Sequence, residues 1–221
     1  MKTLILNLLL VLSMKPMNSD HALFSRPLIL GASVSRGFGT TDGGPGLVIS
    51  KMINPDAVVT NKAMSGHTSV ESTRDLRYFD TDPSIVLAFD LFFWDANREQ
   101  TGKAFEENTK KLFRAYQERR IPMIVGKVPV GVRFPEEIRR AGEKESARKI
   151  NRFLEEVCTL DKGCLLYDPR ACFDLMKGPL SPEGKPYFGD SMHTTNLGNR
   201  FCAEVFVGSR VYRKLLPNTQ E

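Results

Sequence analysis

A serine near one end of the chain and an aspartate–histidine pair near the other are the residue types of a nucleophilic active site. Ser33 follows the apolar run 27–30 and a turn at Gly31, whereas Asp190 stands three residues before His193. A serine that attacks a carbonyl needs an imidazole to take its proton, and the imidazole needs a carboxylate to fix its tautomer. We therefore expect acyl transfer in which Ser33 attacks, His193 accepts the proton and Asp190 holds the ring, with no cofactor.

The residues between these segments predict the elements of an α/β protein. Short apolar runs alternate with longer stretches whose apolar residues recur at helical spacing. Strands separated by helices of this length pair in parallel through right-handed crossovers, with helices on both faces of the sheet. The expected fold class is a three-layer α/β/α sandwich with a mostly parallel five-stranded sheet. The expected strands are 27–30, 57–61, 85–90, 122–127 and 164–167, and the expected helices are 68–78, 102–120, 143–157 and 194–215.

Several unusual loops follow the expected strands. Ser33 comes after the first strand, Gly66 follows the second by a short loop, and residues 90–97 follow the third. Because ligands of a parallel α/β sheet collect beyond the carboxyl ends of its strands, these loops are expected to share one site.

The N-terminal segment 1–22 has the pattern of a secretory signal peptide. Lys2 is followed by the apolar run 4–12, which is too short for a membrane span of about 20 residues. Cleavage after Ala22 would leave a single domain, 23–221; an N-terminal anchor or a core helix is the alternative. We expect a secreted or periplasmic protein whose mature chain has no stable membrane span.

The charge pattern argues against a nucleic-acid partner. The net charge is +5 at pH 7, and the basic stretches 103–120 and 139–152 also hold acidic residues at helical spacing, such as Glu106 with Lys110. Such pairs are typical of solvated helix faces. Aromatic residues do not interleave with these charges as they do on nucleic-acid-binding surfaces.

Four cysteines, at positions 158, 164, 172 and 202, lie in the last third of the chain. They form no Cys-x-x-Cys pair, and the chain has only 3 histidines, so no metal site is expected. Export would allow disulfides. Cys158 and Cys164 flank a short segment that could close as a loop, and four buried thiols are the alternative.

Taken in order, the segments resemble the sequence blocks of the SGNH (GDSL-type) hydrolase family. The resemblance extends from residue 27 to about residue 206. It implies a flavodoxin-like α/β/α fold and the hydrolysis of carboxylic esters by a serine nucleophile. The segments that carry it are 28–33 (LILGAS), 61–69 (NKAMSGHTS), 124–129 (IVGKVP), 150–154 (INRFL), 166–168 (LYD) and 190–198 (DSMHTTNLG).

The resemblance also implies roles for individual residues. Ser33 is then the nucleophile, and Asp190 and His193 complete a catalytic triad. Ala32 departs from the family pattern, which commonly has aspartate before the serine.

The oxyanion hole is where the sequence departs most from the family. The resemblance implies backbone donors at Ser33 and Gly66, but Phe93 falls where the third block has its asparagine donor. Asn97 is a candidate replacement, and the aromatic cluster 92–94 is interpreted as core packing. Losing one oxyanion donor costs about 2.7–4 kcal/mol of transition-state stabilisation. Slow turnover, or a restriction to activated esters, is therefore expected.

Two other functions stay open on this sequence. The fold could serve a non-catalytic binding domain for an envelope glycan or lipid, or an acyltransferase that uses Ser33. A dinucleotide-binding turn is not favoured, because the spacing from Gly31 to Gly37 is longer than in the short-chain dehydrogenase turn. The expected substrate is a small-molecule, lipid or glycan ester; the sequence defines neither its acyl chain nor the oligomeric state.

Overall fold

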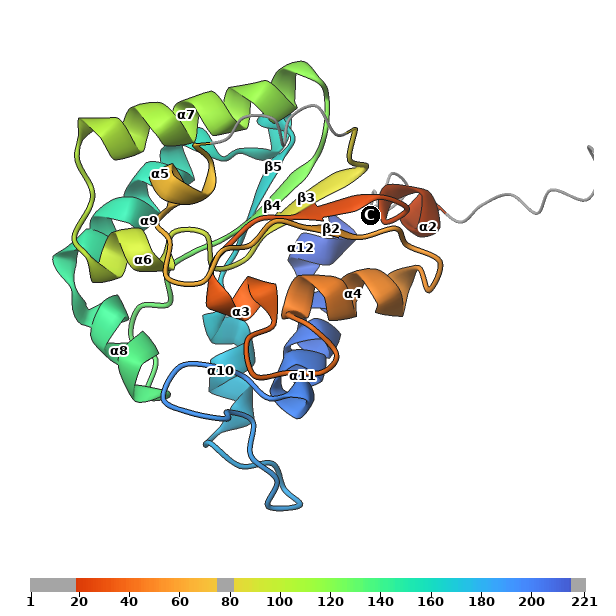
Figure 1. Cartoon of the computed structure of the whole chain (residues 1–221), viewed down its shortest axis with the longest axis vertical. Coiled ribbons are helices and arrows are strands. Elements are labelled where there is room, and N and C mark those ends of the chain that lie inside the picture. The colour runs from red at the N-terminus through yellow and green to blue at the C-terminus, as the bar shows by residue number, and fades with distance from the viewer. Residues whose placement is uncertain (1–18, 75–81, 216–221) are drawn as a thin grey trace, which may run out of the picture.

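The computed structural model describes residues 19–74 and 82–215, which form a five-stranded sheet between layers of helices (Figure 1). The strands are β1 (Pro27–Ile29), β2 (Thr60–Asn61), β3 (Ile85–Ala88), β4 (Met123–Gly126) and β5 (Cys164–Tyr167). Neighbouring strands pair in parallel in the order β2-β1-β3-β4-β5. The predicted α/β/α sandwich is confirmed, and all the described strands are parallel.

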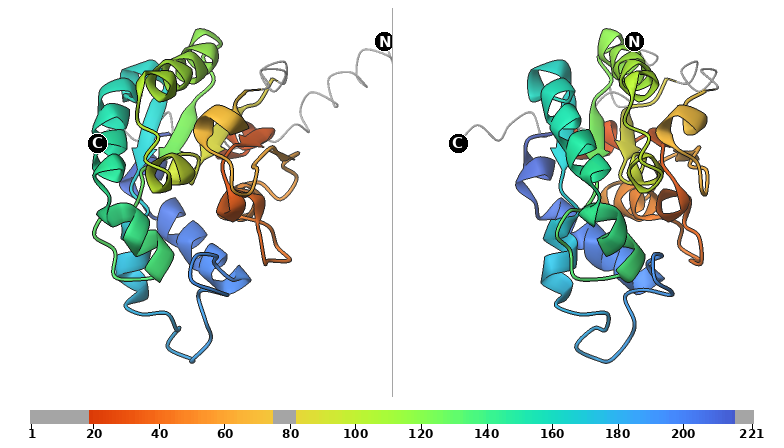
Figure 2. Two further views of the ribbon diagram at one scale, coloured as in Figure 1. Left: turned by 60° about the vertical axis from the view of Figure 1, so that its left-hand side comes forward. Right: turned by 90° about the vertical axis from the view of Figure 1, so that its left-hand side faces the viewer.

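Two helix layers cover the sheet because each strand presents apolar side chains to both faces. Leu28 packs in the core on one side, and its neighbour Ile29 packs in the core on the other. Both layers are visible in the turned views of Figure 2. One holds α7 (Lys103–Glu118) and α9 (Glu145–Val157), and the other holds α4 (Pro45–Ile53), α11 (Asn196–Val207) and α12 (Arg210–Arg213).

Two of the expected helices are longer than the helices in the structure. Over 68–78 the described residues contain only α5 (Ser69–Ser72), whose start is fixed by a capping box between Thr68 and Glu71. Residues 75–78 of that prediction lie outside the described residues. The helix expected over 194–215 is interrupted at Gly208, where α11 ends before α12 begins.

The structure also contains helices that the sequence patterns did not predict. One is α4, which has Pro45 at its first position, where a missing N–H costs nothing. The others are α2 (Ser19–Leu23), α3 (Ser33–Arg36), α6 (Phe93–Asn97), α8 (Glu136–Glu143), the 3-10 helix η2 (Leu160–Lys162) and α10 (Arg170–Met176).

The residues around the predicted cleavage point contact the domain. Tyr212 Oη donates to the Asp20 carboxylate at 2.9 Å, and Asn54 Nδ2 donates to the His21 carbonyl at 3.0 Å. Phe24 is fully buried. Cleavage after Ala22 stays a prediction, and it would remove the first two contacts. None of the described helices combines the length and apolarity needed to cross a bilayer.

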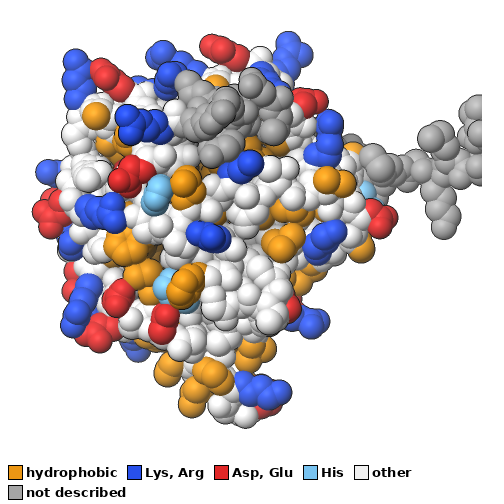
Figure 3. All heavy atoms as spheres, in the orientation of Figure 1, with side chains coloured by type: hydrophobic (Ala, Val, Ile, Leu, Met, Phe, Trp, Pro, Cys, Tyr) orange, Lys and Arg blue, Asp and Glu red, His pale blue; other side chains and the backbone are white. Residues whose placement is uncertain are grey.

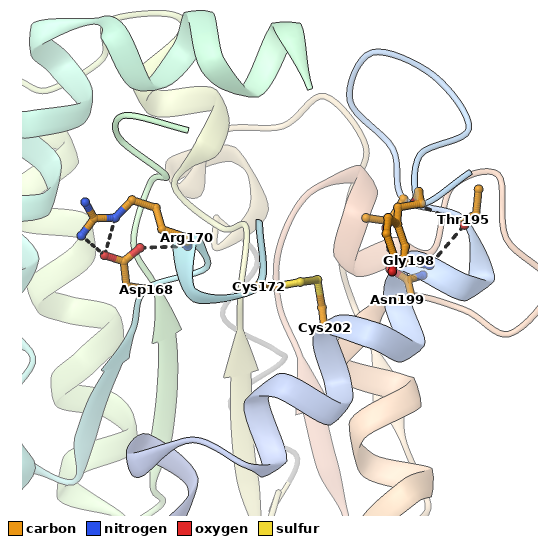
Figure 4. Close-up of a disulfide and its surroundings, with 9 residues drawn as sticks. Asp168, Arg170, Cys172, Thr195, Gly198, Asn199 and Cys202 are labelled. Atoms are coloured by element: carbon orange, nitrogen blue, oxygen red, sulfur yellow. Dashed lines mark hydrogen bonds and ion pairs between the residues drawn. A yellow bond between two sulfur atoms is a disulfide. The ribbon is translucent and has the colours of Figure 1, made fainter. Parts of the chain in front are cut away.

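All four cysteines are paired, which decides between the two alternatives left open by the sequence. Cys158 and Cys164 close the short loop at the start of β5, and Cys172 and Cys202 join α10 to α11. The second disulfide is drawn in Figure 4.

The charged side chains form mixed surfaces rather than a single basic patch. Blue and red atoms are interspersed over the face shown in Figure 3. On α8, Arg139 pairs with Glu143 at 2.5 Å, one turn away, and Arg140 pairs with Glu136. The interpretation of this basic stretch as a solvated helix face is confirmed.

Candidate active site

Ser33 lies at the carboxyl end of β1, where a tight turn leads into α3. The next strand in the sheet is β3, so Ser33 stands where the strand order reverses, which is the usual ligand position in this topology. Gly31 has φ +153°, and a Cβ at this position would lie 2.2 Å from Asp90 Oδ1. Only glycine therefore allows the turn to approach the residues after β3 so closely.

The structure brings the three predicted residues of the acyl-transfer site together. Ser33 Oγ lies 2.9 Å from His193 Nε2, and His193 Nδ1 lies 2.7 Å from Asp190 Oδ2. With the Nδ1 proton donated to the carboxylate, Nε2 is left free to accept the serine proton. Ser33 and His193 are 160 positions apart along the chain, and both distances are those of direct hydrogen bonds.

Asp190 is held in its ionised form. Partial burial alone would raise its pKa, but hydrogen bonds from the backbone and ring of His193 and from the Met192 N–H outweigh that effect. The backbone donors reach Asp190 Oδ1 at 2.6 Å and 2.8 Å. The pKa of Asp190 is therefore lowered, so the carboxylate stays charged beside the imidazole.

The segment that carries His193 is fixed at its far end by the start of α11. Thr195 Oγ1 accepts the Gly198 N–H at 3.2 Å, which caps the helix (Figure 4). Gly198 also packs against the Tyr187 carbonyl, where a Cβ would come within 2.1 Å. The Phe38 ring lies 4.6 Å from the imidazole between centroids, and Phe38 is 55% exposed. The His193 segment is thus held by the start of α11, and the imidazole lies beside an exposed ring.

A further carboxylate, Asp90, organises the serine turn. Its two oxygens accept the backbone N–H groups of Ala32 at 2.9 Å, Val34 at 3.0 Å and Ser35 at 3.2 Å. The N–H of Ser33 is not among these donors, so it is not committed to Asp90. Burial raises the pKa of Asp90, and hydrogen bonds from the turn oppose that rise. Sequence reasoning missed this role; the only hint was the alanine at position 32, where the related family has an aspartate.

The Gly66 loop, the second predicted source of an oxyanion donor, is tied to α6. Gly66 has φ +74°, and its carbonyl accepts Arg98 Nη2 at 2.7 Å. The buried Asp95 accepts the Ser69 N–H at 2.7 Å and the Ser69 hydroxyl at 2.9 Å. These bonds give the loop after β2 a fixed position beside the loop after β3.

Two phenylalanines follow β3 in the segment where the related family has its oxyanion asparagine. Phe93 begins α6 and, with Phe92, lines an apolar cavity that also reaches Ser33. The interpretation of these two rings as core packing alone therefore missed their place beside the site. Asn97 ends α6, where its carbonyl accepts the Lys144 ammonium, and it does not line that cavity. Its role as an oxyanion donor stays a prediction, as do the amide roles of Ser33 and Gly66.

Replacing Asp95 with asparagine should remove a pH dependence of stability. Burial raises the pKa of Asp95 from 3.8 to about 6, against the hydrogen bonds from Ser69. As the pH rises from 4 to 7, the unfolded chain ionises this carboxyl before the folded chain does. The unfolding free energy of the native protein should therefore fall by up to about 3 kcal/mol relative to Asp95→Asn over that interval. Urea unfolding of both proteins at four pH values measures the difference; parallel curves would contradict the prediction.

No family model and no curated protein matches this chain in sequence. Solved structures do share its fold. The esterase EstA from Pseudoalteromonas sp. is 18% identical with a TM-score of 0.61, covering 88% of this chain and 100% of its own. A putative GDSL-like lipase from Parabacteroides merdae is 12% identical with a TM-score of 0.61, covering 87% and 96%. The acetylxylan esterase Axe2 from Geobacillus stearothermophilus is 17% identical with a TM-score of 0.56, covering 88% and 95%. The chain therefore has the fold of the SGNH (GDSL-type) hydrolases, as its sequence blocks predict.

Proposed function

We propose that this protein is an exported serine hydrolase that cleaves carboxylic esters through an acyl-enzyme on Ser33. The observation that carries the proposal is the continuous hydrogen-bonded chain from Ser33 Oγ through His193 to Asp190, with its links of 2.9 Å and 2.7 Å. Structural neighbours described as esterases and lipases support the same class of reaction.

The reaction follows from which groups can accept and donate protons. His193 Nε2 takes the Ser33 proton as Oγ attacks the ester carbonyl, and Asp190 stabilises the imidazolium that forms. The backbone N–H groups of Ser33 and Gly66 are the proposed donors to the oxyanion. The imidazolium then protonates the departing alcohol. Water, deprotonated by the same ring, hydrolyses the acyl-serine and regenerates the enzyme.

An apolar residue at the place of the third donor limits the expected rate. Phe93 carries no hydrogen-bond donor in its side chain, and loss of one such donor typically lowers kcat by about 10²–10³-fold. Esters with good leaving groups, which need less oxyanion stabilisation, are therefore the most suitable first substrates.

Export is the second part of the proposal. Disulfides persist in oxidising compartments and are rare in the cytosol of most organisms. The pairing of all four cysteines supports an extracytoplasmic location, as does the apolar run that follows Lys2.

A fluorophosphonate probe tests both parts. We expect the probe to label the native chain in the exported fraction of the host and to leave Ser33→Ala unlabelled. Ser191→Ala is the matched control, because the Ser191 hydroxyl donates to Glu137 and not to His193. It should keep full labelling. An unlabelled native chain that still binds an envelope glycan or lipid would favour the binding-domain alternative, and a labelled chain confined to the cytosol would contradict export.

A further inference from the structure

An apolar cavity of about 100 Å³ lies beneath Ser33, between the carboxyl ends of the strands and helices α10 and α11. Its walls are mostly aromatic rings and aliphatic side chains, and Ser33 itself lines it. The aromatic rings in the wall are those of Phe89, Phe92, Phe93, Tyr167, Phe173 and Phe206.

The far wall of the cavity is a rigid aromatic cluster. Phe89, Tyr167 and Phe206 meet edge to face, with ring centroids 5.3 to 5.8 Å apart. The disulfide between Cys172 and Cys202 forms another part of the wall and joins α10 to α11 (Figure 4). A space bounded in this way is largely preformed, as small-molecule sites usually are.

The surroundings of Ser33 differ in a way that matters for an acyl-enzyme. Ser33 lines the apolar cavity, whereas His193 does not line it and packs against the exposed Phe38. His193 protonates the alcohol, so the alcohol must leave on the His193 side, towards solvent. The acyl group stays bonded to Ser33 Oγ until water releases it, and the apolar cavity that Ser33 lines suits a chain that stays bound.

We infer that the cavity beneath Ser33 binds the acyl chain of the substrate and selects esters of short-chain fatty acids. The inference rests on the proposed function and names its substrate class. An apolar cavity of about 150 Å³ holds benzene, so about 100 Å³ corresponds to roughly four carbon atoms at the same packing. Phe93, where an oxyanion donor was expected, contributes apolar surface to this space.

A series of p-nitrophenyl esters from acetate to decanoate measures the chain-length preference. Each methylene that enters the cavity should raise kcat/KM about fourfold, the equivalent of about 0.8 kcal/mol. We expect the rise to stop between butanoate and hexanoate and kcat/KM to fall for octanoate and decanoate. Acetate esters of alcohols of increasing length should show no such rise. A flat acyl series, or a rise with the alcohol chain instead, would overturn the inference.

Two matched variants locate the effect in the cavity. Phe206→Leu removes part of the far wall and enlarges the cavity. It should raise the ratio of kcat/KM for hexanoate to kcat/KM for butanoate about fourfold, the effect of burying one more methylene. Phe113→Leu makes the same substitution in the core on the other face of the sheet, at a residue that does not line the cavity, and should leave that ratio unchanged. Equal ratios in the two variants would overturn the assignment. If no ester is hydrolysed in a Ser33-dependent way, the proposed function is wrong. If hydrolysis depends on Ser33 but shows no chain-length preference, only the acyl-chain inference is wrong.

Discussion

Ser33→Ala and His193→Ala should each lower kcat for ester hydrolysis by about 10⁴–10⁶-fold, and the double variant should lose no more than either single variant. The reason is that the two residues act as one unit: without the ring the hydroxyl keeps its proton, and without the hydroxyl the ring has nothing to activate. The residual rate comes from substrate binding and backbone donors to the oxyanion. Single-turnover kinetics with p-nitrophenyl butanoate provides the measurement.

Asp190→Asn is the companion to this experiment. Asparagine keeps the shape of the side chain but cannot stabilise the imidazolium, and an equivalent change in a catalytic triad lowers kcat about 10⁴-fold. Multiplicative losses in the Ser33/His193 double variant would mean that the two residues act independently, which would contradict the proposed mechanism.

Asp90→Ala should both destabilise the protein and disable the serine turn. Three backbone N–H groups would lose their acceptor. A buried donor left unpaired costs about 1–3 kcal/mol, so the unfolding free energy should fall by about 3 kcal/mol or more. Because the same bonds set the position of Ser33, we also expect a loss of about 100-fold or more in kcat. Urea unfolding and the rate of fluorophosphonate labelling measure the two effects separately.

Two further variants separate positioning from general destabilisation. Asp90→Asn keeps one acceptor oxygen but turns an NH₂ group towards the turn, so its labelling rate should fall while the protein stays folded. Asp168→Asn changes a carboxylate after β5 that pairs with the partly exposed Arg170. It should alter the unfolding free energy by less than about 1 kcal/mol. Normal labelling of folded Asp90→Asn would show that the carboxylate does not position Ser33.

The strands and the pairing of Asp190 with His193 could be predicted because their signals are local. Four or five consecutive apolar residues mark each buried strand. Asp190 and His193 are three residues apart, so their pairing can be recognised within one short segment. The polar helix α8 gave no such signal, since Ile138 is its only large buried apolar side chain. Helix α6 is five residues long, too short for a helical period to be seen.

The role of Asp90 could not be predicted because it depends on the order of strands in the sheet. Asp90 and Ala32 are 58 positions apart, and they meet because β3 pairs directly with β1. The cavity likewise depends on how residues at the ends of strands, in the loops after them and on several helices surround the space under Ser33. No spacing within one segment carries that information.

The disulfide between α10 and α11 has a consequence for the integrity of the site. Cys172 and Cys202 are 30 positions apart in the sequence. The segment between them contains Asp190, His193 and the loop that projects at the bottom of Figure 1. Leu180, between these cysteines, is 53% exposed, and exposed loops are preferred sites of proteolytic cleavage. A single cut there would produce two polypeptides that remain covalently joined through Cys202. Asp190 and His193 would stay attached to the part of the protein that carries Ser33, so a cut in this loop would not release them.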